Sequence, residues 1–284
     1  MTRIVALVLL GLSTGISPIR AADSNLPHSE DVYQGWLKMY DLEFDEAHRI
    51  FGQRTQNHPV DPLGPASDAA AYLFSELARL GALESELFVD DARFADRKKL
   101  QPNPQLRLHF TQQINQADHL ADTTLQKSPN DANALFAKSL TYGLRADYAA
   151  LVDKQNLTAL VFTREGRPYG DKLLLVDPGA FDAYLGSGVE NYLLSLKAAP
   201  LRILLRLTGS RIDHDKGLEQ LRMTALHGYY LEPFAKLLLA VAALRDKNPE
   251  QAAQLLQELH DRFPNNGLYS VELDRISSKP KISR

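Results

Sequence analysis

The stretch NPEQAAQLLQELHDRFPNN (residues 248–266) decides the fold of this chain. Its leucines fall on one face at helical spacing, and Ala252 stands twelve residues before Pro264. The same interval from a small residue to a proline occurs three more times, from Ala47 to Pro59, from Ala117 to Pro129 and from Gly166 to Pro178. A small residue lets a neighbouring helix cross closely and a proline ends a helix, so the recurrence predicts repeated, packed helices.

A second register accompanies the first. Positions ten residues after three of these prolines are small, and so are the positions twelve residues before Ala47 and Ala252. The sequence therefore predicts antiparallel helix pairs in which each small residue faces its partner helix. The nine predicted packing residues are Gly35, Ala47, Ala69, Ala117, Ser139, Gly166, Gly188, Ala240 and Ala252.

This register predicts five helix pairs, of which the first (residues 28–61) and the fifth (residues 233–266) are uninterrupted. In the middle three pairs the two small positions are 48, 27 and 29 residues apart instead of twelve, which predicts insertions between the two helices. The fourth pair lacks a closing proline and is expected to end at His227 and Gly228.

The composition narrows the possible functions. The 284 residues carry a net charge of −3, and basic and acidic residues are interspersed, which argues against a nucleic-acid binder with its basic stripe. There is no cysteine, so disulfides, thiolate metal sites and cysteine nucleophiles are excluded.

The N-terminus has the pattern of a leader. Arg3 precedes an uncharged run over residues 4–19, and Ala21 and Ala22 follow as small residues suited to cleavage. We expect a signal peptide over residues 1–21, export to a periplasmic or secreted location, and a single helical repeat domain over residues 22–284. An uncleaved anchor and a plain N-terminal tail are the alternatives.

The paired register resembles the tetratricopeptide-repeat family across residues 22–284. Stretches such as FDEAHRIF, GALESELFVDDARF and HDKGLEQLR are similar to an atypical envelope subgroup of that family with long insertions. That subgroup is itself similar to mitochondrial outer-membrane tetratricopeptide proteins. The resemblance implies an all-α solenoid of helix pairs that binds a protein or peptide partner as a scaffold or adaptor.

Solenoids bind partners on a concave face lined by the first helix of each pair. Trp36 and Tyr40 follow Gly35 on such a helix and are candidates for an exposed aromatic binding pair, with burial in the core as the alternative. Asn133, Asp182 and Arg245 occupy further positions that are expected to face the groove, with ordinary solvated helix surface as the alternative.

The most apolar part of the chain after the leader is ENYLLSLKAAPLRILLRLTGSR. Its stripe consists of Leu201, Leu204, Leu205 and Leu207, beside two arginines one turn apart. A basic amphipathic helix of this kind lies on a membrane or holds an acidic partner. We instead expect the stripe at residues 201–207 to pack on neighbouring helices.

Motifs for catalysis are absent from the sequence. GSG at residues 186–188 falls inside a predicted helix, the histidines lack paired-ligand spacing, and no phosphate-binding glycine loop occurs. We therefore expect no enzyme, no cofactor and no metal. Two alternatives stay open: a small-ligand binder or enzyme whose pocket is built by the insertions, and a membrane-associated assembly component.

Overall fold

A computed structural model describes residues 28–81, 101–207 and 209–278, and within them every regular element is a helix. The predicted all-α class is confirmed. In chain order the elements are α1 (Glu30–Tyr40), α2 (Phe44–Asn57), α3 (Leu63–Arg79), α6 (Pro104–Lys127), α7 (Ala132–Asp147), the π-helix η1 (Tyr148–Val152), α8 (Asn156–Val176), the 3-10 helix η2 (Phe181–Ala183), α9 (Tyr184–Ser195), α10 (Ala199–Leu207), α11 (His214–His227), α12 (Glu232–Arg245), α13 (Pro249–Arg262) and α14 (Gly267–Ser278).

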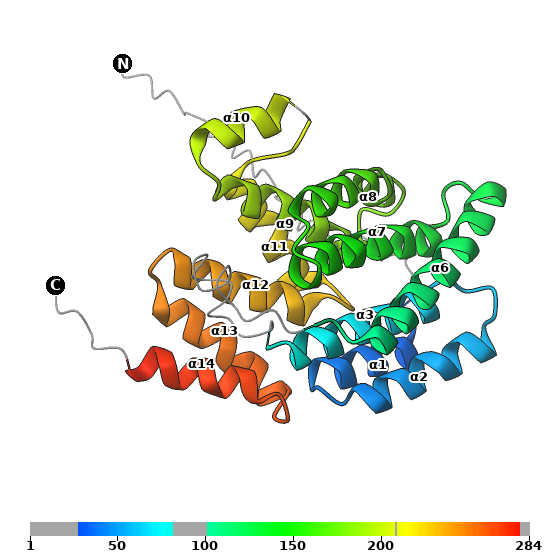
Figure 1. Ribbon diagram of the computed structural model, residues 1–284, viewed down its shortest axis with the longest axis horizontal. Helices are drawn as coiled ribbons and strands as arrows, with labels where there is room; N and C mark the ends of the chain where they lie inside the picture. The colour runs from blue at the N-terminus through cyan, green and yellow to red at the C-terminus, as the bar shows by residue number, and fades with distance from the viewer. Residues whose placement is uncertain (1–27, 82–100, 208, 279–284) are drawn as a thin grey trace, which may run out of the picture.

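The five predicted helix pairs are present, and they follow one another as an array of antiparallel helix pairs (Figure 1). The pairs are α1 with α2, α3 with α6, α7 with α8, α9 with α11, and α12 with α13. The fourth pair ends as expected, because α11 stops at His227 with Gly228 as its C-cap. A further helix that the register did not predict, α14, packs against α13 at the end of the array.

Close helix crossings explain the small residues of the register. A Cβ added at Gly35 would lie 2.3 Å from the ring of Phe51, a fully buried side chain of α2. A Cβ added at Gly166 would lie 2.6 Å from the Cβ of Tyr142. Of the nine predicted packing residues, all except the half-buried Ser139 are buried. The small side chains therefore set how closely the two helices of a pair approach.

Local signals in the sequence define several helix starts. The side chains of Asn103, Asp131, Asp213 and Asn248 each accept a hydrogen bond from a backbone N–H of the first turn that follows. Such N-caps satisfy donors that the helix itself leaves unpaired. Prolines also stand in the first turn of α6, α12 and α13, where their missing N–H costs nothing.

The insertions take three forms. In the second pair, residues 82–100 lie outside the described part of the chain, and α6 is long, at 24 residues. In the third pair the extra residues continue the helices themselves, through η1 and the 21-residue α8, so no long loop separates its helices. In the fourth pair the insertion carries the short helix α10.

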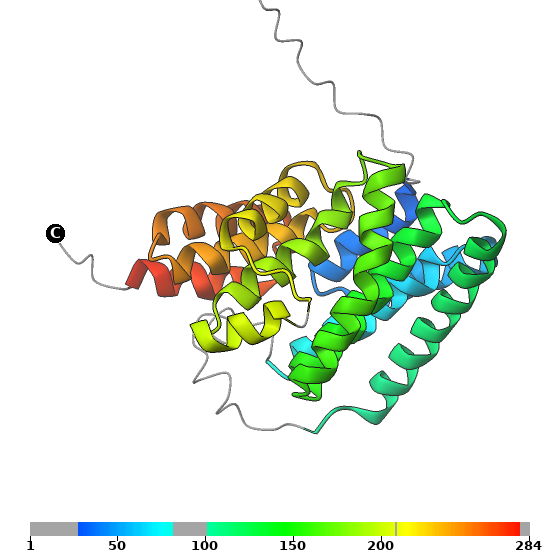
Figure 2. The same ribbon diagram turned by 90° about the horizontal axis from the view of Figure 1, so that it is seen from above.

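The first and last helices of the array meet, which the sequence did not predict. The hydroxyl of Tyr40 on α1 donates to the backbone oxygen of Tyr230 at 3.0 Å, and the amide of Asn266 donates to the backbone oxygen of Tyr40 at 2.8 Å. Asn265 reaches Asp41 beside them through its backbone N–H, at 2.8 Å. Figures 1 and 2 show α1 next to the C-terminal helices, and one apolar core runs from α1 to α14.

The sequence raised two possibilities of membrane contact, a leader at the N-terminus and an apolar helix within the array. The predicted signal peptide, residues 1–21, lies outside the described residues. Among the helices that the structure describes, none has the length and apolar character needed to cross a membrane.

Candidate functional site

The predicted aromatic binding pair is buried, so that prediction is wrong. Trp36 is 1% exposed and donates its indole N–H to Ser67 at 3.0 Å, while Tyr40 is 4% exposed. Both rings pack near Tyr230, which enters the interior from the turn before α12. Because the ends of the array meet, the inner faces of its first helices form a core where an open groove was expected.

Asp182 is also buried, at 3% exposure, so the prediction that it contacts a partner in a groove is wrong. Its hydrogen bonds form a cluster that we call the clasp. Its carboxylate accepts hydrogen bonds from the backbone N–H groups of Tyr229, Tyr230 and Leu231, all between 3.0 and 3.1 Å. Burial raises the pKa of Asp182, and these three N–H groups oppose the rise. The clasp holds the turn that delivers Tyr230 to the core.

The other two predicted contact residues lie apart from this cluster. Asn133 is half-buried at the start of α7, and its side-chain amide donates to the Asp61 carboxylate at 2.7 Å, which ties α7 to the turn after α2. Arg245 is half-buried in the last turn of α12; burial raises the pKa of Tyr192 to about 12, and the charge of Arg245 partly opposes this rise. The structure thus brings together three of the five predicted residues, Trp36, Tyr40 and Asp182, and buries all three.

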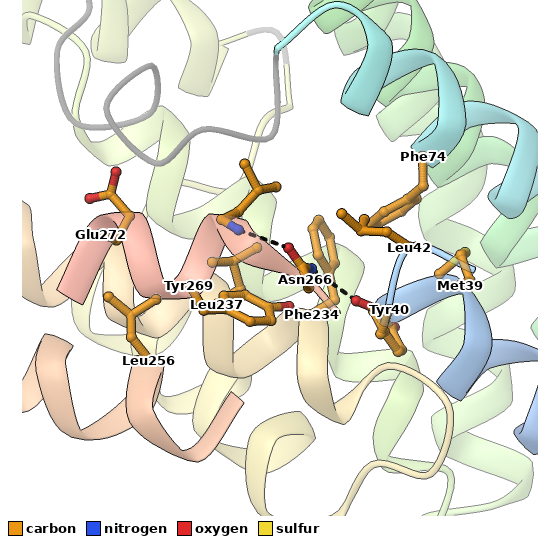
Figure 3. A pocket seen from close by; sticks show the side chains of 11 residues that line it. Met39, Tyr40, Leu42, Phe74, Phe234, Leu237, Leu256, Asn266, Tyr269 and Glu272 are labelled. Atoms are coloured by element: carbon orange, nitrogen blue, oxygen red, sulfur yellow. Dashed lines mark hydrogen bonds between the residues drawn. The ribbon is translucent and has the colours of Figure 1, made fainter. Parts of the chain in front are cut away.

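A different surface has the shape of a docking site: an apolar hollow where the first and last helices meet (Figure 3). Four of its apolar side chains, from the turn after α1 and from α12 and α14, are only half-buried and so face the opening. They are Leu42, Phe234, Leu237 and Leu268. More deeply buried side chains, including Met39, Phe74 and Leu256, form its floor.

Leu42 is held in the hollow by an unusual backbone. Its φ is +63°, in the left-handed region that side chains other than glycine rarely adopt. Lys154 and Lys247 have the same conformation in the turns between the helices of the third and fifth pairs, so the geometry belongs to this type of turn. A leucine at such a position is strained by roughly 1 kcal/mol or more, and here its side chain lines the hollow.

Few polar groups converge on the hollow. The amide of Asn266 is committed to the backbone of Tyr40, and its oxygen accepts the N–H of Leu268 at 3.2 Å. Glu272 pairs with Arg275 on the same helix. Burial raises the pKa of Tyr269 above its ordinary value, so its hydroxyl stays protonated at neutral pH. The hollow therefore offers apolar contact and little acid–base chemistry.

The size of the hollow limits what it accepts. Its cavity volume is about 20 Å³, on the order of one water molecule by this measure. Small-molecule sites usually enclose a ligand in ~300–1,000 Å³. In the part of the chain that the structure describes, no group of three histidine, aspartate or glutamate side chains is placed to hold a metal ion. The hollow suits contact with the tip of an apolar side chain better than an enclosed ligand.

Sequence reasoning missed every residue at the opening of the hollow. Leu268 lies on α14, whose sequence GLYSVELDRISS falls after the last predicted pair. Phe234 and Leu237 lie on the predicted fifth pair, but a helix pattern alone does not show which apolar positions stay uncovered. A signal did exist for α14, because an apolar period continues after Pro264.

Comparisons with known proteins add little to this geometry. No protein-family model and no curated protein matches the sequence. Among solved structures, the chain is similar to a thermophilic TPR protein of Thermus thermophilus, with 14% sequence identity and a TM-score of 0.43. The similarity covers 88% of this chain and 99% of that one. The helix-pair packing described above, and not this similarity, is the basis for the fold.

Proposed function

We propose that this chain is a protein-interaction scaffold that contacts the tip of an apolar side chain of its partner at the hollow between its first and last helices. The main support for the proposal is the set of apolar side chains at the opening of the hollow. Four half-buried apolar side chains from segments more than 190 residues apart surround a cavity too small for an enclosed ligand. Interfaces commonly derive much of their affinity from one such anchor in an apolar pocket.

The hollow also weakens the rival in which the insertions build a ligand pocket. Its lining side chains come from α1 and the turn after it, α3, α12, α13 and α14 with the turn before it, and none belongs to α10 or to the extensions of the third pair. Few polar groups converge there, whereas an enzyme site needs several at defined positions. A partner helix or loop with one protruding apolar residue fits this chemistry best.

The test compares two glycine variants at equivalent turns. Leu42→Gly removes a lining side chain, and Lys247→Gly is the matched control, because glycine relieves a positive φ at both positions and only the first change alters the hollow. Both variants are expected to fold, since glycine adopts this backbone without strain. Retained folding is checked by circular dichroism and thermal unfolding.

The chain without residues 1–21 is used for affinity capture from an envelope extract of source cells, followed by mass spectrometry and direct titration of any purified partner. We expect one defined protein to bind wild type and Lys247→Gly, and to bind Leu42→Gly at least about tenfold more weakly, the equivalent of one buried side chain. Equal binding by both variants, or no specific protein on well-folded wild type, would refute the hollow as the docking site.

We also propose that the scaffold acts outside the cytosol, in a periplasmic or secreted location. The support is the basic, apolar and small-residue order over residues 1–21, together with a chain free of cysteine. N-terminal sequencing of the protein from source cells tests this. A mature end near Ala22 in the envelope or secreted fraction is expected, and an intact Met1 in the cytosolic fraction would contradict export.

A further inference from the structure

The helix α10, in the insertion of the fourth pair, is placed differently from the other helices. It projects from one end of the molecule in Figure 1, beyond α9 and α11, and in the described structure none of its residues is buried. The sequence-based expectation that its apolar stripe packs on neighbours is therefore wrong for Leu201 and Leu207, whereas Leu205 of the stripe is half-buried. Leu201 is 44% exposed and Leu207 is 80% exposed; the side chain of Leu204 lies outside the described part.

The exposed apolar surface extends beyond the predicted stripe. Ile203 on α10 is 60% exposed, and Leu193 and Leu196 at the end of α9 are 42% and 36% exposed. Single exposed leucines are common on soluble proteins, but a cluster on one projecting element marks a surface that is covered in use. The question is which surface covers it.

Charge indicates the kind of partner. Between Glu190 and Asp213 the chain has four basic residues and no acidic one, although the net charge of the whole chain is negative. Arg211 pairs with Asp171, whereas Arg202 and Arg206 donate to backbone oxygens, those of Ser195 and Ile212. Arg206 and Lys197 are exposed beside the apolar side chains. The covering surface is therefore expected to be anionic.

The arrangement favours a lipid surface over the other occupants. A second copy of this chain would bring the same arginines and lysines together across a two-fold axis, which is unfavourable. A protein groove usually binds a protruding element through one or two anchoring side chains. Here the exposed apolar side chains are instead spread over α10 and the end of α9, which project from the molecule. We propose that α10 and the end of α9 form an interfacial element. Ile203 and Leu207, which lie one turn apart on the same face of α10, insert into an anionic membrane surface.

The proposal separates into an apolar and an electrostatic contribution. The exposed leucine and isoleucine side chains supply the insertion, and the basic residues beside them attract anionic headgroups, each by about 1 kcal/mol near the surface. Neither contribution requires a spanning helix. Binding is expected to be reversible and to weaken as salt rises, because added ions screen the attraction between the arginines and the lipid.

The test is co-sedimentation of the chain without residues 1–21 with vesicles of phosphatidylcholine alone or of equal parts phosphatidylcholine and phosphatidylglycerol. We expect wild type to bind the anionic vesicles at least about tenfold more tightly than the neutral ones. The double variant Ile203→Ser with Leu207→Ser should lose at least about tenfold in binding. The control Val271→Ser changes a 53% exposed side chain on α14, at the opposite end in Figure 1, and should bind as wild type does.

A second variant separates charge from insertion. Lys197→Gln with Arg206→Gln should abolish the preference for anionic vesicles, and unchanged melting curves would show that all these variants fold. Failure of wild type to bind either vesicle, or equal binding by wild type and Ile203→Ser with Leu207→Ser, would overturn the proposal. Concentration-dependent dimerisation that this variant abolishes would instead show that a second copy covers α10. The hollow variant Leu42→Gly should still bind vesicles, which keeps this test independent of the scaffold proposal.

Discussion

At the scale of single residues, the buried carboxylate of Asp182 shows how one side chain organises a turn. It takes three consecutive backbone N–H groups that have no helix to receive them, and in doing so holds Tyr230 in the core. Gly228 stands beside it because a Cβ there would lie 2.6 Å from the Asp182 carboxylate. The sequence identified Asp182 as notable but for the wrong reason, since its partners are the chain's own amides.

Replacement of Asp182 with alanine is expected to lower the free energy of unfolding by about 2–4 kcal/mol, because buried N–H donors lose their acceptor. Urea unfolding monitored by circular dichroism measures this. The control is Asp215→Ala, whose side chain is fully exposed, and it should cost well under 1 kcal/mol. Equal losses in the two variants would show that the clasp contributes nothing beyond an ordinary surface aspartate.

Asp147 provides a prediction about pH. Burial raises the pKa of Asp147 from its ordinary 3.8 to about 7. The folded chain thus holds this proton more tightly than the unfolded chain, so the stability linked to it is complete below about pH 3.8 and is lost as pH rises through about 7. Asparagine resembles the protonated form and does not titrate.

Asp147→Asn should therefore unfold at nearly the same urea concentration as wild type at pH 4 and at a higher one at pH 8. The comparison between the two proteins cancels the other titrating groups. Asp215→Asn, at an exposed position, serves as the control and should follow wild type at both pH values. A constant difference between Asp147→Asn and wild type across this range would contradict a proton-linked contribution of this carboxyl to stability.

At the scale of elements, the helix pairs follow from small residues at crossings. The small-residue register correctly predicted five pairs, the pairing order and the end of α11, because each depends on residues close in sequence. It did not predict the form of the insertions. In the third pair the extra residues lengthen helices, whereas in the fourth they form α10, and the helical period alone does not separate these outcomes.

Two glycine-to-alanine variants test the crossings in opposite directions. A Cβ at Gly217 would lie 2.6 Å from the backbone N of Tyr192, so Gly217→Ala must push α11 away from α9 and is expected to cost about 2 kcal/mol or more. A Cβ at Gly143 on α7 meets no atom within 4 Å. Gly143→Ala should therefore stabilise the protein by up to about 1 kcal/mol, through helix propensity. Thermal or urea unfolding of both variants shows whether each substitution raises or lowers the stability of the protein. A change in the same direction for both variants would contradict this packing of the helices.

At the scale of the whole molecule, contact between the first and last helices distinguishes this array from an open solenoid. Open arrays are stabilised only by neighbouring repeats, and their ends open first. Here α1 bonds to segments about 190 to 226 residues away, through Tyr40, Tyr230 and Asn266. The contact buries the inner face of α1 and, at its margin, leaves the apolar hollow.

Tyr40→Phe tests the contribution of this closure. The ring stays packed while the hydrogen bond to Tyr230 is lost, so a cost of about 1 kcal/mol is expected. Hydrogen exchange monitored by mass spectrometry should show that the α1 amides of wild type exchange as slowly as the α7 amides. In Tyr40→Phe, the α1 amides should exchange faster than in wild type, and the α7 amides should not change. If wild-type α1 already exchanges much faster than α7, the ends do not stabilise one another.

The sequence by itself determined the helix pairs and their small-residue crossings. These features depend on spacings of up to a few tens of residues, and helical geometry places such residues on known faces. Only the tertiary structure decided that Trp36, Tyr40 and Asp182 are interior, that α10 is exposed, and that a hollow forms between α1 and α14. Those outcomes depend on the rotation between successive pairs summed over the whole array, and no local pattern of residues specifies that sum.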